Sequence, residues 1–206
     1  VHFGRGRAGN ARSVAELGET VGFNVSQVAS VRDGDIAISS TAIREALAAG
    51  NLDDAVRWSG HPVPVSGQVE RGRELGRQLG FPTANLPVPP GKVPLARGVY
   101  AGWARIQDEW RAAVSNLGRA PTVVEGGPLR LEVHVLDGNP ELYGHRLEVA
   151  LGTMLRPETK FSSEAELRVA IGSDCEAARD WVASAPPWAR PDRRAALRRP
   201  VNGGAA

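Results

Sequence analysis

The chain has 206 residues, of which 42% are hydrophobic and 5% aromatic, enough for one good core or two small ones. Its single cysteine, Cys175, excludes an internal disulfide, and no apolar run approaches the roughly 18 residues that a membrane span needs. We therefore expect a cytoplasmic protein with no signal peptide and no membrane partner.

The net charge of +2 is distributed unevenly along the chain. Residues 185–206 contain five arginines and one aspartate, so this segment carries +4 and the preceding 184 residues carry −2. The segment is rich in proline, alanine, arginine and glycine and lacks the apolar residues of a core, so we expect a basic, disordered tail. A solvated terminus explains such a tail better than an RNA contact, and nucleic acid is not the predicted partner.

The first element in chain order is a loop rich in glycine and arginine. The stretch "GRGRAG", residues 4–9, matches G-x-G-x-x-G, but only three residues precede it. A dinucleotide-binding loop needs a strand before it and a helix directly after it, so we interpret the stretch as a flexible loop. The apolar residues between 25 and 31 alternate enough for a strand or two at most.

Two short helices follow, in "ISSTAIREALAAGNLDDAVRWSG". Ser40 or Thr41 is predicted to cap the first helix and Gly50 to end it, and Asn51 is predicted to cap the second. Because both helices are too short to stand alone, residues 1–60 are interpreted as the last portion of an α/β unit.

Strand-like runs separated by turn residues dominate the chain after residue 60. They are "VPVSGQVERG", "RGVYAGWARIQ", "EWRAAVSNLG", "LRLEVHVLDG" and "LYGHRLEVALGTMLR". Asp108-Glu109 and "DGNPE", residues 137–141, stand where two hairpin turns are expected. Five or six such strands in about 95 residues favour an antiparallel sheet closed into a small barrel.

A helix is predicted at the C-terminal end of this region. Ser163 and Glu166 form a capping box in "SSEAELRVAIGSDCEAARDWVA". Apolar residues then recur at helical spacing: Leu167, Ala170, Ile171, Ala178 and Val182. We expect this face to close over the barrel.

One span carries the candidate chemistry, "VERGRELGRQLGFPTANL", residues 69–86. Its glycines would let backbone amides approach a polyphosphate, and Arg73 and Arg77 would add charge, although a surface hairpin explains the same spacing. The prolines fix Thr83 and Asn85, whose hydroxyl and carboxamide oxygens can share a hard cation bound to phosphates. Glu132 joins them if its face of the strand meets this loop, and is otherwise an exposed acid.

Other chemistries lack support in the sequence. There is no G-x-x-x-x-G-K-[ST] loop and no nucleophile elbow of a hydrolase. The four histidines never fall at metal-ligand spacing, so a zinc site is not predicted.

The span 69–86 and the strand-like runs quoted above, together with "VSNLGRAPT", "LEVHVLD" and "GSDCEAAR", resemble riboflavin kinase over about residues 61–182. The resemblance implies a mainly β fold, a six-stranded antiparallel Greek-key barrel with a C-terminal α-helix. It also implies transfer of the γ-phosphoryl group of ATP to the 5′-hydroxyl of riboflavin, which gives FMN and ADP. Residues 61–184 are thus expected to form the kinase-like domain.

The resemblance also implies roles for single residues. Thr83 and Asn85 are expected to bind the Mg2+ of Mg-ATP, and Gly72 and Arg77 to lie beside the nucleotide. Glu132 is expected to act as general base. Two further residues, in "LRPETKF", are weaker candidates for contacts with the flavin: Arg156 and Phe161.

The segment before the kinase blocks resembles the end of the adenylyltransferase module of bacterial bifunctional FAD synthetases. The matching stretches are "FGRGRAGN" and "SSTAIR". That module also needs an H-x-x-H pair, which the printed chain lacks, so we expect no FAD synthesis from it. The alternative to a kinase is a noncatalytic flavin- or nucleotide-binding barrel whose basic tail contacts RNA. The oligomeric state is left open.

Overall fold

The computed structural model describes residues 2–72, 74–89, 94–119 and 128–191. The chain forms two compact units, Val1–Ile38 and a second unit that begins at Ser39. Most of the predicted tail, residues 192–206, lies outside the described residues.

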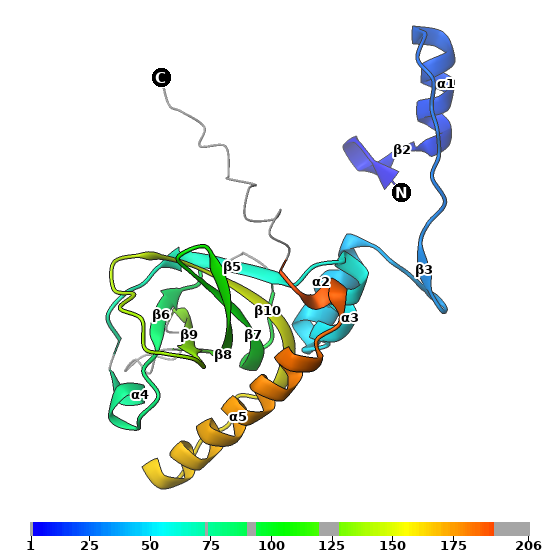
Figure 1. Ribbon diagram of the computed structural model, residues 1–206. Helices are drawn as coiled ribbons and strands as arrows, with labels where there is room; N and C mark the ends of the chain where they lie inside the picture. The colour runs from blue at the N-terminus through cyan, green and yellow to red at the C-terminus, as the bar shows by residue number, and fades with distance from the viewer. Residues whose placement is uncertain (1, 73, 90–93, 120–127, 192–206) are drawn as a thin grey trace, which may run out of the picture. The chain divides into compact units, whose positions relative to one another are not determined.

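The second unit is built on one six-stranded antiparallel sheet (Figure 1). Its strands are β5 (Val63–Gln68), β6 (Ala84–Pro87), β7 (Gly98–Ile106), β8 (Glu109–Arg119), β9 (Leu129–Val135) and β10 (Arg146–Pro157). They lie in the order β5-β10-β7-β8-β9-β6. The chain leaving β5 then meets β6, because the Glu70 amide donates to the Asn85 carbonyl at 2.9 Å. The sheet is therefore nearly closed, and the predicted antiparallel barrel is confirmed.

Side chains from every strand of the sheet fill the barrel interior. The largest fully buried ones are Tyr100, Leu86, Leu117, Leu131, Leu147, Leu151, Val133 and Val149. Each leucine removed from water in this way contributes about 1.5–3 kcal/mol. Burial also raises the pKa of Tyr100 to about 12, so its phenol stays neutral and donates to the Ala96 carbonyl.

Helix α5 (Glu164–Ser184) packs on the outer face of the sheet over β7 and β8, as predicted (Figure 1). Its Cys175 and Ala178 pack against Val99, Ala101 and Val114, which point away from the barrel interior. Ser163 caps the helix by accepting from the Glu166 amide at 3.2 Å. The Glu166 carboxylate accepts from the Ser162 hydroxyl at 2.8 Å, so the reciprocal bond of the predicted capping box goes to the preceding residue.

The helices α2 (Ser40–Ala49) and α3 (Leu52–Ser59) belong to the barrel unit and not to the N-terminal segment. Their buried residues Leu47, Leu52 and Val56 join the interior core of the barrel. Ser39 caps α2, with its hydroxyl accepting from the Ala42 amide at 3.1 Å. The compact unit thus begins 22 residues earlier than position 61, where the change in sequence texture set the predicted boundary.

The first residues of the predicted tail are also packed. Residues 187–189 form the short 3-10 helix η2 (Pro187–Ala189), which lies against α3. Ala185 and Ala189 are 3% and 2% exposed. The disorder predicted for 185–206 therefore does not hold for residues 185–191. The low apolar content of the segment did not predict this packing, because the buried residues are small alanines.

The two predicted hairpin turns have different outcomes. Strands β7 and β8 pair through a tight turn at Gln107 and Asp108, both with positive φ, which suits the twist of a hairpin. The "DGNPE" turn does not make a hairpin, because β9 pairs with β6 and β8 while β10 pairs with β5 and β7. Residues 136–145 instead cross from one strand pair to another, and turn residues alone do not encode that choice.

The first unit is small. It contains β1 (His2–Phe3), the 3-10 helix η1 (Arg5–Arg7), β2 (Gly9–Asn10), α1 (Ala11–Val21), β3 (Arg32–Asp33) and β4 (Ile36–Ala37). Strand β2, whose second residue Asn10 caps α1, pairs antiparallel with β1. A dinucleotide-binding loop instead joins a strand of a parallel sheet to its helix. Among the residues of this unit whose burial is described, only Gly18 is buried. The alternating residues 25–31 form no strand.

Candidate active site

Strands β6 and β9 place Asn85 directly opposite Glu132. The neighbouring pairs, Ala84 with Val133 and Leu86 with Leu131, are buried in the barrel core. Because side chains alternate along a strand, Asn85 and Glu132 share the other face of the sheet. Directly opposed residues have Cβ atoms about 4.5–5.5 Å apart. The proline-rich loop and the strand glutamate, 47 positions apart in sequence, therefore meet.

Asn116 of β8 flanks Glu132 on its other side. The carboxyl group is thus placed between two carboxamides in a row that crosses β6, β9 and β8. Asparagine side chains both donate and accept hydrogen bonds. Glu132 therefore has a polar group on either side, which can hydrogen-bond the carboxyl whether it is ionised or neutral.

The glycines of the loop are required by close approaches to the candidate metal ligands. A Cβ on Gly72 would lie 2.3 Å from Nδ2 and 2.8 Å from Oδ1 of Asn85. A Cβ on Gly76 would lie 2.4 Å from the Phe81 carbonyl oxygen and 3.4 Å from Oγ1 of Thr83. The backbone at Gly72 therefore passes directly over the Asn85 carboxamide, which a larger residue would displace. At Gly76 a larger residue would clash with the Phe81 carbonyl, whereas Thr83 Oγ1 would lie at ordinary contact distance.

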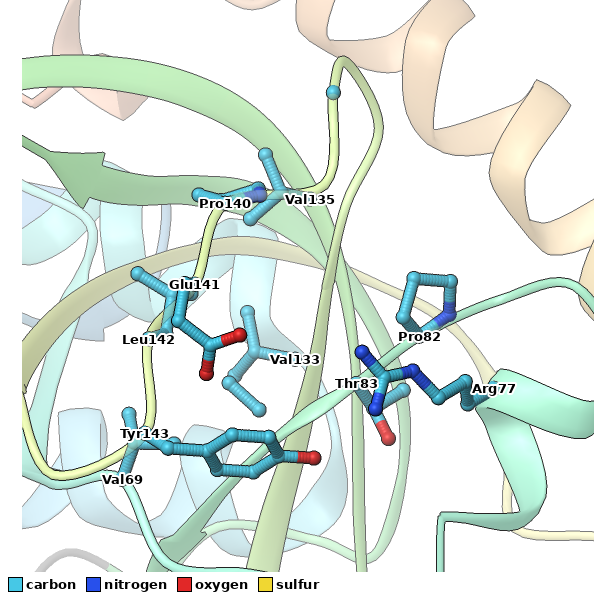
Figure 2. A pocket seen from close by; sticks show the side chains of 12 residues that line it. Val69, Arg77, Pro82, Thr83, Val133, Val135, Pro140, Glu141, Leu142 and Tyr143 are labelled. Atoms are coloured by element: carbon cyan, nitrogen blue, oxygen red, sulfur yellow. The ribbon is translucent and has the colours of Figure 1, made fainter.

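A small pocket opens beside Thr83 (Figure 2). Thr83 and Arg77 line one side, and Glu141 and Tyr143 from the β9–β10 connection line the other. Its volume of about 40 Å³ is far below the roughly 300–1,000 Å³ of a site that encloses a small-molecule ligand. The pocket therefore marks groups that a ligand would contact and does not enclose a nucleotide.

The loop before the pocket is basic, and its charges are partly paired. Arg71 and Arg77 lie 3.8 and 3.7 Å from the carboxylate oxygens of Glu74, at the start of α4 (Leu75–Gln78). The Arg71 guanidinium also lies 5.1 Å from the centre of the Tyr143 ring. Exposed pairs of this kind contribute little stability, so both guanidinium groups are available to an anion.

The environment of Glu132 changes its proton affinity. The side chain is solvent accessible, but the surrounding protein removes part of its hydration and raises the pKa of the carboxyl above its ordinary value. Arg130 acts in the opposite direction, and its guanidinium is paired with Glu70 at 3.3 Å. A raised pKa makes the carboxylate a better proton acceptor, which suits a general base.

Arg156 and Phe161 lie elsewhere in the unit. The Arg156 guanidinium donates two hydrogen bonds to Asp174 of α5, at 2.8 and 2.7 Å, and lies 5.5 Å from the Phe161 ring centre. In the sheet, Val99 and Asn116 separate Arg156 from Glu132. Three strand spacings amount to about 14 Å. The structure thus pairs Asn85 with Glu132 and sets Gly72 against Asn85. Arg77 and Thr83 line the small pocket, whose lining does not include Asn85 or Glu132, and Arg156 and Phe161 lie apart from both groups.

Several residues at or near the site escaped the sequence analysis. At the site they are Asn116, His134, Glu141 and Tyr143. Beside Arg156, away from the site, there is Asp174. Strand alternation could have indicated His134, which follows Glu132 by two residues and shares its face. No sequence pattern predicts the role of Asp174, because it meets its partner Arg156 only when α5 packs on the sheet.

Phosphoryl transfer is the chemistry that such a site suits. It needs groups that position a polyphosphate and its metal, with a carboxylate to accept the proton of the attacking alcohol. Among the described residues, no group of three or more histidine, cysteine, aspartate or glutamate side chains is arranged to hold a metal ion.

The family model for riboflavin kinase matches residues 59–182, and the chain belongs to that family. Enzymes of this family are ATP-dependent phosphotransferases that convert riboflavin and ATP to FMN and ADP. The matched residues include the whole barrel, the loop with Thr83 and Asn85, and most of α5.

Curated relatives are longer than this chain. Bifunctional riboflavin kinase/FMN adenylyltransferases from Pseudomonas fluorescens and Escherichia coli (strain K12) are each 40% identical to it, over 178 and 180 residues. The alignments cover 86% and 87% of this chain, which spans 57% of the length of either relative.

A solved structure described as a macrolide-efflux protein from Streptococcus pneumoniae also resembles this chain, with a TM-score of 0.75 and 33% identity. The alignment covers 88% of this chain and 58% of the other. In the part of the present chain that the structure describes, no helix has the length and apolar character to cross a membrane. This likeness supports the fold of the chain.

Proposed function

We propose that this chain phosphorylates the 5′-hydroxyl of riboflavin with Mg-ATP, and that Glu132 is the general base. The observation that supports this most directly is the register of β6 and β9, which pairs Glu132 with Asn85. The base is thereby next to a residue suited to the metal-bound phosphates. A protein that only bound flavin or nucleotide would not need a partly desolvated carboxylate at this position.

The residues present fit a magnesium ion that enters with the nucleotide. Mg2+ prefers oxygen ligands and usually keeps waters and substrate phosphates in its coordination shell. The Thr83 hydroxyl and the Asn85 carboxamide offer two neutral oxygens, and Gly72 leaves room for the carboxamide. Bound there, the ion would neutralise charge on the phosphates during transfer.

In the proposed reaction, the 5′-oxygen of riboflavin attacks the γ-phosphorus of ATP as its proton passes to the Glu132 carboxylate. The new oxygen–phosphorus bond forms while the bond between the γ-phosphorus and the bridging oxygen breaks, and ADP leaves. Arg77 is proposed to lie beside the nucleotide phosphates, since it lines the pocket with Thr83. Gly72 is proposed to contact the nucleotide through its backbone.

Arg156 and Phe161 remain proposals for the flavin side of the site. The Arg156 guanidinium is already bound by Asp174. We therefore propose that Arg156 holds Phe161 in place and does not itself bind the substrate. The cation–π contact between the two side chains supports this role.

The test is FMN formation by the whole chain with riboflavin, ATP and Mg2+, resolved by chromatography. Glu132→Gln keeps the shape of the side chain and removes the base, so we expect a rate loss of about 10²-fold or more. Glu109→Gln is the matched control, since that strand glutamate has a side chain 75% exposed at the far hairpin. Equal FMN yield from the wild type and Glu132→Gln would refute the role of Glu132. No FMN from the wild type would refute the kinase assignment.

A further inference from the structure

His134 occupies a position that the reaction above does not use. It lies on β9 two residues after Glu132, between the inward-facing Val133 and Val135, which are 1% and 4% exposed. Alternation therefore directs His134 to the same outer face as Glu132. Its cross-strand partner on β8 is Val114, part of the apolar layer beneath α5.

The imidazole is hydrogen-bonded to the loop that carries Thr83. Its Nδ1 lies 2.8 Å from the carbonyl oxygen of Pro82, 52 positions away in sequence. A carbonyl oxygen only accepts hydrogen bonds, so Nδ1 carries the hydrogen and donates it. The oxygen belongs to the peptide group that joins Pro82 to Thr83, so the bond acts on the backbone immediately before the candidate metal ligand.

This contact restrains the backbone torsion that the proline ring leaves free. The pyrrolidine ring fixes φ of Pro82 near −65°. The angle ψ then determines the orientation of the Pro82–Thr83 peptide, and a hydrogen bond to the oxygen of that peptide restricts ψ. Proline and histidine together therefore define where the Thr83 side chain begins.

The residue before Pro82 strengthens the same anchor. The rings of Phe81 and His134 meet edge to face, with centroids 5.7 Å apart and planes at 85°. Phe81 also packs against the apolar layer between α5 and the sheet, and its amide donates to the Gly76 carbonyl at 2.7 Å. The turn is thus held on one side by β9 and on the other by its own glycine.

We propose that His134 is a positioning residue of the kinase site, whose Nδ1–H orients the Pro82–Thr83 peptide so that Thr83 faces the metal-bound nucleotide. The proposal rests on the function proposed for Thr83. A single strand then supplies both the base and the anchor of the metal-binding loop, at positions 132 and 134. Their separation is the two-residue repeat of a strand, about 6.6–6.8 Å.

Two substitutions separate the hydrogen bond from the ring. His134→Asn keeps an N–H donor close to the position of Nδ1 and loses the aromatic ring. His134→Phe keeps the ring against Phe81 and loses the donor. If the hydrogen bond matters, His134→Phe should lower kcat/KM for Mg-ATP about tenfold, while the KM for riboflavin changes less than twofold and His134→Asn stays within about threefold of the wild type.

Two measurements do not depend on turnover. One is hydrogen exchange of the peptide that contains Thr83 and Asn85, which should be faster in His134→Phe than in His134→Asn. The other is calorimetric binding of a non-hydrolysable ATP analogue with Mg2+, which should weaken in the same order. Hydrogen exchange and calorimetric binding can be interpreted even if the wild type makes no FMN. A failure of this proposal is therefore distinguishable from a failure of the kinase assignment.

Unchanged kinetics, exchange and binding in His134→Phe would overturn the proposal. So would equal losses in both variants that extend to the KM for riboflavin, because these would indicate general packing. If His134→Phe does not fold, His134→Gln replaces it, since glutamine moves the donor one methylene farther out. Wild-type exchange and binding in His134→Gln would equally overturn the proposal.

Discussion

Replacing Gly72 with alanine should displace the Asn85 carboxamide and damage the proposed site while leaving the barrel folded. The new Cβ would lie 2.3 Å from Nδ2, 2.7 Å from Cγ and 2.8 Å from Oδ1 of Asn85, whereas ordinary contacts begin at 3.4 Å. The side chain must therefore retreat by about 1.1 Å, since packed interiors do not tolerate such overlap. The φ of Gly72 is not positive, so alanine meets no obstacle in the backbone itself.

The expected cost differs between activity and stability. A shift of 1 Å in a group that positions a reactant can cost about 100-fold in rate, so kcat/KM for Mg-ATP should fall about 10- to 100-fold. Overpacking of this size destabilises by about 1–3 kcal/mol, which lowers Tm by about 2–12 °C in a domain of this length. Steady-state FMN formation and thermal unfolding measure the two effects.

A double-mutant cycle with Asn85→Ala provides the control. Alanine at 85 has no carboxamide to displace, so Gly72→Ala should cost little further activity in that background. If Gly72→Ala lowers kcat/KM by the same factor with and without the Asn85 side chain, the clash is not the cause and the reasoning from the close approach is refuted.

Two further predictions concern single side chains. Desolvation raises the pKa of Glu132 above its ordinary 4.5, and a general base acts only when it is ionised. We therefore expect kcat/KM to decrease as the pH falls through that raised pKa. A pH profile that stays flat down to pH 4.5, or a Glu132→Gln variant that keeps the acid limb, would contradict this prediction. Asp174→Ala should lower the free energy of unfolding by about 2–3 kcal/mol in urea, because it leaves the Arg156 guanidinium without its two charged hydrogen bonds. The exposed Asp180→Ala on the same helix is the control, and equal losses from the two would contradict the second prediction.

Local chemistry in the sequence was enough for most of the fold. Alternating strands with turn residues between them predicted the barrel, and the Ser163 capping box with its helical apolar spacing predicted α5. The glycines that end α2 and α3, Gly50 and Gly60, adopt the left-handed conformation that helix ends favour. These features depend on neighbours within four residues, which is why they can be read from a single chain.

Contacts between segments far apart in the chain could not be predicted from the sequence in the same way. The turn residues 137–141 mark a reversal of the chain but not which strand follows beside β9. Residues 185–191 looked unable to pack because their apolar content is low, yet Ala185 and Ala189 fit where larger side chains would not. For the candidate site, sequence named Asn85 and Glu132 separately, and only the register of β6 and β9 shows that they face each other.

The packing of Phe81 connects helix α5 with the loop that carries Thr83. Phe81 inserts into the apolar layer beneath α5, where Cys175 and Ala178 lie, and the next two residues in the chain are Pro82 and Thr83. A change that shifts α5 therefore moves Phe81 and, through it, the peptide that His134 holds. Burial raises the pKa of the Cys175 thiol to about 11, which keeps this residue a neutral packing group in that layer. The helix is thus part of the support of the proposed metal-binding loop, although none of its side chains lines the pocket beside Thr83.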